Sequence, residues 1–172
     1  GAMYRAVALK TLEEKIDLNN KEQVLNCLNR TDIQVVYKEG RQAIILDGRD
    51  VTSYIRTPEV SRAASDIAVI PEVRLKLVDL QRKMASEFPL VMDGRDIGTF
   101  VLPDATVKIF LTASVEERAK RRWKEMQQNG ISETLQNVMD DIKRRDLNDS
   151  ARSFAPLKKA EDAVLIDTTH MT

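Results

Sequence analysis

Three short, nearly continuous apolar runs constrain the fold of this sequence more than any other feature. They cover residues 90–92 (Leu-Val-Met), 107–111 (Val-Lys-Ile-Phe-Leu) and 163–166 (Ala-Val-Leu-Ile). Strands covered on both faces of a parallel sheet have this composition, whereas strands with one solvated face alternate apolar and polar residues. Helical segments precede the first run and separate the second from the third. Strands that alternate with helices indicate an α/β fold with a mostly parallel sheet.

The helical segments are marked by apolar spacing together with capping residues. Thr57-Pro58 and Ile70-Pro71 each place a proline at a first helical position, which is a common helix start. Ser114 and Glu117 form a capping box, and Asn129-Gly130 is typical of a helix end. We expect helices over residues 3–16, 20–29, 57–67, 71–87 and 114–129, and a last helix that includes 135–142.

A different period appears between residues 31 and 55. Ile33, Val35 and Tyr37 alternate with polar residues, Glu39-Gly40-Arg41 follows, and residues 43–46 are apolar. Two such runs around a glycine-containing turn predict a β-hairpin. We expect a third short strand near residues 51–52, so this region forms a small antiparallel insert.

Composition excludes several classes of protein. A length of 172 residues suits one domain, or one domain with a small insert. Lys and Arg number 27 and so do Asp and Glu, which argues against a uniformly basic nucleic-acid binder. No apolar run approaches the ~18 residues of a membrane span, so we expect no membrane partner. One cysteine and one histidine exclude a Cys/His zinc site, and the lone Cys27 fits a small core residue in a reducing, cytoplasmic compartment.

Charged residues fall where helical spacing predicts inward-facing positions. The apolar stripe at residues 135, 138, 139 and 142 continues to Arg145 and Asp149, and Arg152 follows three residues later. Arg5 repeats this pattern in the first turn of the first helix. A charge on an inward face is costly unless it is paired or faces a ligand. For each residue alone, the alternative is a solvated charge at a frayed helix end. Four such positions together weaken that alternative.

A second polar feature directly follows the apolar run at 90–92. Asp93-Gly94-Arg95-Asp96 stands where the strand ends, and ligands of open α/β sheets bind at the carboxyl ends of strands. Glycine allows close approach of backbone to a ligand, and arginine can donate two parallel hydrogen bonds to phosphate. The alternative is an Asp-Gly turn with surface charges. Residues 47–50 repeat the tetrapeptide after the hairpin; we interpret that copy as structural and the copy at 93–96 as functional.

A basic cluster lies on the helix that begins at Ser114 and contains Arg118, Lys120, Arg121 and Arg122. It could be a solvated basic face, a nucleic-acid patch or a segment that clamps phosphate. Together with the inward-facing arginines it predicts a small anionic ligand at the carboxyl edge of a parallel sheet. A phosphorylated nucleotide fits this description.

Five segments closely resemble the bacterial cytidylate kinases, which are CMP/dCMP kinases of the P-loop nucleoside-monophosphate kinase superfamily. They are residues 1–5 (GAMYR), 55–60 (IRTPEV), 92–99 (MDGRDIGT), 113–118 (ASVEER) and 155–158 (APLK). The resemblance implies a three-layer kinase-type parallel sheet with helices on both faces. It also implies a core of residues 1–30 and 88–172 with a lid at about 114–150, and a monophosphate-binding domain at 31–87 that carries the hairpin.

The resemblance implies phosphoryl transfer from ATP to CMP or dCMP with Mg²⁺, and it assigns roles to ten side chains. The CMP phosphate would be held by Arg5 and Arg95. The cytosine would be read by Ser65, Arg74, Asp96 and Arg152. The sugar would meet Arg145 and Asp149. The lid over ATP would contain Arg118 and Arg122, which together with Arg95 and Arg145 would serve the transfer step. The alternatives are a helix-surface hydroxyl for Ser65 and a solvated first-turn charge for Arg74.

One departure from the family pattern is large. The family begins with a strand and a phosphate-binding loop, G-x-x-x-x-G-K-[ST], and no Gly is followed by Lys in this sequence. We therefore expect a fragment cut at both ends that lacks the first strand and this loop. Such a chain should have negligible kinase activity alone and should tend to self-associate, although the full-length enzyme would be a monomer. The alternatives to an enzyme are a non-catalytic nucleotide-binding or phosphate-binding domain and, more weakly, an RNA-binding module.

Overall fold

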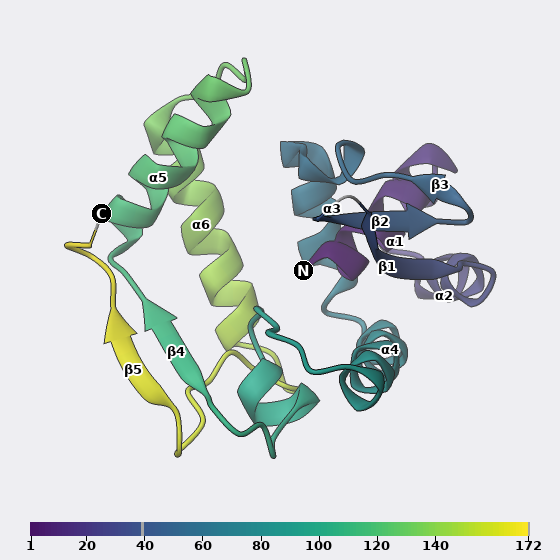
Figure 1. The fold of residues 1–172 in the computed structure, drawn as a ribbon. Helices are drawn as coiled ribbons and strands as arrows, with labels where there is room; N and C mark the ends of the chain where they lie inside the picture. The colour runs from purple at the N-terminus through teal and green to yellow at the C-terminus, as the bar shows by residue number, and fades with distance from the viewer. Residues whose placement is uncertain (39, 172) are drawn as a thin grey trace. The chain divides into compact units, whose positions relative to one another are not determined.

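The structure, a computed structural model, describes residues 1–38 and 40–171. The chain divides into two compact units, Gly1–Val91 and Met92–Thr172. Figure 1 labels their helices and strands in chain order. Among the described residues, no helix is both long enough and apolar enough to cross a membrane.

Helices α3 and α4 of the first unit begin at the prolines that the sequence marks, and side chains cap the starts of α2 and α3. Thr57 Oγ1 accepts a hydrogen bond from the backbone N–H of Val60 at 3.2 Å, and Asn20 Oδ1 accepts one from Gln23 at 3.1 Å. Side chains at these positions satisfy N–H groups that have no partner within the helix. The elements are α1 (Ala2–Glu13), α2 (Lys21–Asn29), the short 3₁₀ helix η1 (Tyr54–Arg56), α3 (Pro58–Ile67) and α4 (Pro71–Glu87). The predicted helices of this region are therefore confirmed, except that the first ends at Glu13 rather than at residue 16, where the positive φ of Lys15 has already ended the helix.

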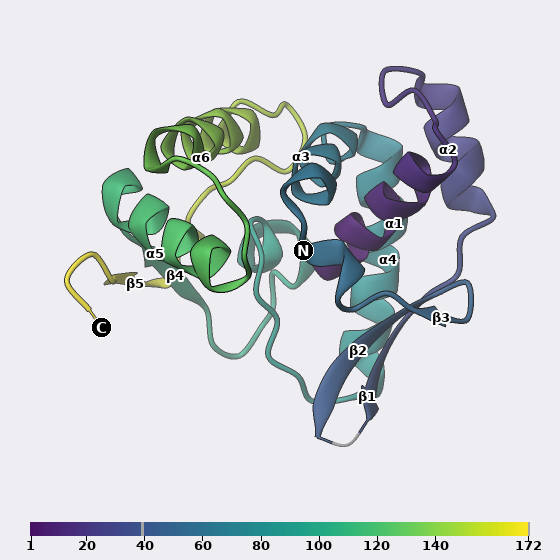
Figure 2. The ribbon, with the colours of Figure 1, turned by 90° about the horizontal axis from the view of Figure 1, so that it is seen from above.

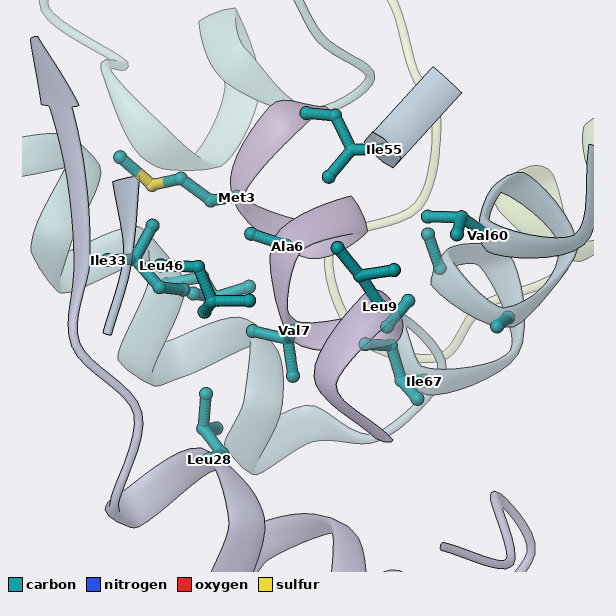
Figure 3. Close-up of a cluster of buried hydrophobic side chains, with 14 of the residues drawn as sticks. Met3, Ala6, Val7, Leu9, Leu28, Ile33, Leu46, Ile55, Val60 and Ile67 are labelled. Carbon is teal, nitrogen blue, oxygen red and sulfur yellow. The ribbon is translucent and has the colours of Figure 1, made fainter. Parts of the chain in front are cut away.

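Helix α1 lies at the centre of the core of the first unit. Its residues 6–8 are fully buried, and apolar side chains from the other elements surround it. Figure 3 shows this cluster, in which α1 meets Leu28, Ile33, Leu46, Ile55, Val60 and Ile67. Burial of each large aliphatic side chain contributes about 1.5–3 kcal/mol. Cys27 is also buried, as predicted, and burial raises the pKa of its thiol.

The predicted hairpin forms an antiparallel sheet in the order β1-β2-β3. Strand β1 (Ile33–Lys38) pairs with β2 (Arg41–Leu46), and Ile33 lies opposite Leu46. Figure 2 shows this pair as a long arm. The position of Glu39 in the predicted turn lies outside the described residues. The third strand, β3, is Arg49–Asp50 rather than 51–52, because the two-residue turn at Asp47 and Gly48, with φ values of 48° and 82°, returns the chain at once.

The Asp-Gly-Arg-Asp copy at residues 47–50 fixes this sheet to α1. Lys10 Nζ lies 2.6 Å from Asp47 Oδ2 and donates to the carbonyl of Arg30 at 3.0 Å. Asp47 Oδ1 accepts from the N–H of Asp32 at 2.9 Å, and Arg49 pairs with Glu13 at 2.6 Å. The charged side chains of this copy thus contact neighbouring elements of the unit, which supports its structural interpretation.

We predict that Asp47→Asn lowers the free energy of unfolding by about 1 kcal/mol at neutral pH, since Asp47 is partly exposed. Burial alone would raise the pKa of Asp47, but the hydrogen bonds from Lys10 and from the backbone of Asp32 outweigh it and lower the pKa. A lowered folded-state pKa means that the stabilisation is complete above the ordinary value of about 3.9 and disappears as the pH falls through the folded pKa. In urea unfolding between pH 7 and pH 2, the free energies of unfolding of the unsubstituted protein and of Asp47→Asn should therefore converge at low pH. Asp104→Asn, the same change on an exposed turn, is the control; an equal loss there would contradict the prediction.

The second unit contains a parallel strand pair and a helical hairpin. Strand β4 (Ile109–Thr112) pairs in parallel with β5 (Val164–Asp167), and Ile109 lies opposite Val164. A π-helical turn, η2 (Ile97–Val101), precedes them, and α5 (Val115–Gln128) and α6 (Leu135–Ser150) lie between them in sequence. The N-cap oxygens of Ser114 and Thr134 accept from Glu117 and Asn137, each at 3.1 Å. The predicted parallel sheet with helices is thereby confirmed in its coarse form.

Two further predictions about the strands are wrong. Residues 90–92 do not form a strand, and Val91 is fully exposed. A strand requires a neighbour for its ladder, and within the described residues β4 and β5 pair only with each other. The second error concerns burial, because apolar side chains of β4 and β5 that should be covered on both faces are exposed. They are Ile109, Leu111, Val164 and Leu165.

Candidate functional site

The second unit brings three of the predicted site residues into direct contact. Arg95 Nε lies 3.1 Å from Asp149 Oδ2, and Arg152 forms an ion pair with Asp149 Oδ1. We call Arg95, Asp149 and Arg152 the Asp149 cluster. Asp149 is buried, as its place on the helical stripe predicts, and the Arg152 side chain is 7% exposed. Two guanidinium groups on one carboxylate give the cluster a net positive charge, which suits an anionic ligand.

The end of α6 and the loop behind it position this cluster. Asp149 lies in the last turn of α6, and Arg152 stands two residues beyond the helix, where a cation is favoured by the helix dipole. The backbone N–H of Leu157 donates to the carbonyl of Asp149 at 2.8 Å, which turns the loop back toward α6. Phe154 of the loop packs edge-on against Phe100 of η2, with ring centroids 4.9 Å apart. The loop is therefore held against α6 at Leu157 and against η2 at Phe154.

The Asp-Gly-Arg-Asp copy at residues 93–96 lies in different surroundings from the copy at 47–50. Asp96 is buried, and its carbonyl accepts from the N–H groups of Phe100 and Val101 at 2.9 and 3.2 Å. A Cβ atom on Gly94 would come within 2.7 Å of Ile97 Cγ1, so a larger residue would displace the Ile97 side chain. The Arg95 side chain remains 46% exposed and can reach a ligand in solution.

The basic residues of α5 are held by protein acceptors. Arg118 makes a two-pronged contact with Asp146 at 2.7 and 3.1 Å, and its Nε donates to the carbonyl of Ala113 at 3.0 Å. Arg121 donates to the carbonyls of Thr168 and Met171, and the predicted lid residue Arg122 pairs with Glu125 at 2.8 Å. These contacts favour a structural role for much of the basic face over a nucleic-acid patch. Arg145 is half-buried on α6, one residue before the partner of Arg118.

The first unit holds the other predicted site residues. Arg5 Nη1 donates to the carbonyl of Ile55 at 3.3 Å. Arg74 is 3% exposed, so it is not the solvated charge that was the alternative interpretation, and its Nη1 donates to Ala68 at 3.2 Å. The Ser65 hydroxyl is buried and has no hydrogen-bond partner among the residues that the structure describes. A buried hydroxyl without a partner costs about 1–3 kcal/mol, which favours a role toward a ligand.

The sequence alone did not identify two contact partners of these residues. Tyr4 lies beneath the Arg74 guanidinium, with the Cζ atom 5.7 Å from the ring centroid, and Asp146 holds Arg118. Tyr4 immediately precedes Arg5, and Asp146 follows Arg145. Their adjacency to predicted site residues was the only available signal.

The described residues contain no group of three or more His, Cys, Asp or Glu side chains that could hold a metal ion. These described residues therefore do not fit a Mg²⁺ site made of protein ligands alone. Mg²⁺ in nucleotide enzymes is commonly bound through one or two carboxylates together with substrate phosphates.

Comparison with known proteins agrees with a site for an anionic ligand. The family model described as cytidylate kinase matches residues 1–172. The cytidylate kinase of Caldicellulosiruptor saccharolyticus is 53% identical over 172 residues, which are 100% of this chain and 76% of that relative. The cytidylate kinase of Bacillus subtilis is 46% identical over the same 172 residues, which are 77% of its length. With a match over its full length and relatives of this similarity, the chain belongs to the cytidylate kinase family.

Proposed function

We propose that this protein catalyses transfer of a phosphoryl group from ATP to CMP or dCMP, giving CDP or dCDP, and that the described residues carry the cytidylate-binding part of the site. The observation that supports this most is the Asp149 cluster, in which a buried carboxylate of α6 holds Arg95 and Arg152. A kinase for a nucleoside monophosphate needs guanidinium groups for phosphate and fixed polar groups for the base. The chain offers guanidinium groups, such as that of Arg95, and buried polar side chains, such as that of Asp96.

The proposed base readers match the hydrogen-bonding edge of cytosine. Cytosine presents an amino donor at C4 and acceptors at N3 and O2, whereas uracil presents an acceptor and a donor at the first two positions. Asp96, which is buried, can accept from the amino group, and the guanidinium of Arg74 can donate to the ring acceptors. The Ser65 hydroxyl can do either. A site built this way rejects uracil because buried polar groups would be left unmatched.

The proposed transfer step depends on positioning and on charge stabilisation. Bound ATP supplies the phosphoryl group. Arg5 and Arg95 would hold the accepting phosphate, and Arg145 and Asp149 would orient the sugar. Arg118 and Arg122 are proposed for the ATP side, where the guanidinium of Arg118 would have to exchange its contact with Asp146 for a phosphate oxygen.

A second candidate function is non-catalytic binding of a cytidine nucleotide. One sequence fact bears on it, which is that no Gly is followed by Lys in the 172 residues. A coupled ADP-release assay with ATP, Mg²⁺ and CMP separates the two. ADP release that depends on CMP would support the kinase, whereas CMP binding without ADP release would support the non-catalytic function.

Nucleotide binding tests the proposed site itself. Isothermal titration of the 172-residue chain should give a dissociation constant for CMP at least about tenfold below that for UMP, because one unmatched buried polar group costs ~1–3 kcal/mol. Ser65→Ala should raise the constant for CMP several-fold with little effect on UMP. Ser86→Ala, at an exposed hydroxyl of α4, is the matched control. Equal affinity for CMP, UMP and AMP would contradict the proposed site.

A further inference from the structure

The guanidinium of Arg74 is a buried cation at the corner between α3 and α4. It is 3% exposed and donates to the carbonyl of Ala68, the C-cap residue of α3. Partial negative charge at the end of α3 favours this contact. Arg74 also lies near the N-terminus of α4, where the helix dipole opposes a cation. The position of its guanidinium therefore depends on its other neighbours.

Tyr4 of α1 is such a neighbour. The Cζ atom of Arg74 lies over the Tyr4 ring at 5.7 Å from its centroid, within the range of a cation–π contact. Tyr4 is half-buried, so the contact forms away from bulk water, where such contacts are strongest. The planar guanidinium can meet a ring with its face while its N–H groups remain available at its edges.

A second polar group marks the same end of α3. Ser65 stands three residues before Ala68, and residues three apart lie side by side on a helix surface. Arg74, which binds Ala68, is thus brought to the end of α3 that carries Ser65. The Ser65 hydroxyl is buried and lacks a hydrogen-bond partner among the described residues.

We propose that Tyr4 is a positioning residue for cytosine specificity. Its ring holds the guanidinium of Arg74 so that the N–H edge faces the same small region as the Ser65 hydroxyl, where the cytosine ring acceptors would lie. Tyr4 adjoins Arg5 in α1, so one helical turn would position both the base reader and a phosphate-binding arginine. This inference rests on the proposed function, because it requires that Arg74 contact the base.

The test compares Tyr4→Leu and Tyr4→Phe with Arg74→Ala in the 172-residue chain, by isothermal titration with CMP and UMP. Tyr4→Leu should raise the dissociation constant for CMP about tenfold, the magnitude of a partly desolvated cation–π contact, and change that for UMP less than twofold. Tyr4→Phe keeps the ring and should keep the CMP/UMP ratio. Arg74→Ala should abolish the ratio. Thermal unfolding checks that each variant is folded, and Tyr4→Met replaces Tyr4→Leu if the latter does not fold.

The chain offers a matched control. The Cζ atom of Arg49 lies over the ring of Tyr54 at 5.8 Å, a similar pair outside the proposed site, so Tyr54→Leu should leave the CMP/UMP ratio unchanged. If Arg74→Ala abolishes the ratio and Tyr4→Leu preserves it, the role of Tyr4 is wrong and the proposed site stands. An equal loss for CMP and UMP in Tyr4→Leu also overturns the inference, since Tyr4 would then be merely structural. If Arg74→Ala itself preserves the ratio, base reading by Arg74 fails, and the inference about Tyr4 fails with it.

Discussion

Arg95→Ala is expected to weaken binding of CMP, UMP and AMP by a similar factor of about 30, since a charge-assisted hydrogen bond to phosphate contributes ~2 kcal/mol. Arg95 is the exposed member of the Asp149 cluster, and its guanidinium can reach a phosphate while it remains close to Asp149. The phosphate is common to all three nucleotides, so the CMP/UMP ratio should not change. Isothermal titration with each nucleotide measures both quantities.

The repeated tetrapeptide supplies the control for Arg95. Arg49 occupies the equivalent place in residues 47–50 and pairs with Glu13, so Arg49→Ala should leave nucleotide affinity unchanged. A loss confined to CMP in Arg95→Ala would contradict the assignment of Arg95 to phosphate. Equal losses in the two variants would contradict the distinction between the two copies.

Asp149→Asn is expected to lower the free energy of unfolding by about 3 kcal/mol, within the range for breaking a buried ion pair from one side. The substitution keeps the shape of the side chain but removes the charge that faces both Arg95 and Arg152. The guanidinium of Arg152 would stay in its buried position beside a neutral amide. CMP binding should fall along with stability, because the cluster would lose its geometry.

Urea unfolding of the second unit, followed by the fluorescence of Trp123, measures this effect. Asp140→Asn makes the same change on the same helix at an exposed position and should alter stability by less than ~0.5 kcal/mol. A loss in Asp149→Asn no larger than that of Asp140→Asn would show that the buried cluster does not stabilise the unit.

Local signals in the sequence predicted most of the secondary structure. Capping residues and prolines marked the starts of α3, α4 and α5, and alternation with a glycine turn marked the β1–β2 hairpin. The run at residues 90–92 failed because a strand depends on a hydrogen-bonded neighbour, which apolar composition does not supply. Apolar composition also cannot predict the burial of β4 and β5, because a residue such as Leu111 is covered only if a further element packs against its face.

The site shows the same division between local and distant contacts. Helical spacing predicted that Asp149 points inward, because it lies seven residues after Ile142 on one face of one helix. The pairing of Arg95 with Asp149 joins residues far apart in the sequence, and no periodicity indicates it. The two Asp-Gly-Arg-Asp copies illustrate the difficulty: Arg49 meets Glu13 and Arg95 meets Asp149, so identical letters acquire different roles from tertiary packing.

The proposed function requires that a defined set of guanidinium groups contacts a cytidine nucleotide. It is tested most directly by NMR of the arginine Nε–Hε groups while CMP is added to the chain. We expect the signals of Arg74, Arg95 and Arg152 to shift with CMP. The signals of Arg30, Arg49 and Arg121, which bind carboxylates or carbonyls elsewhere, should stay in place. Unchanged signals for the first three residues at saturating CMP, or equal shifts for both groups, would contradict it.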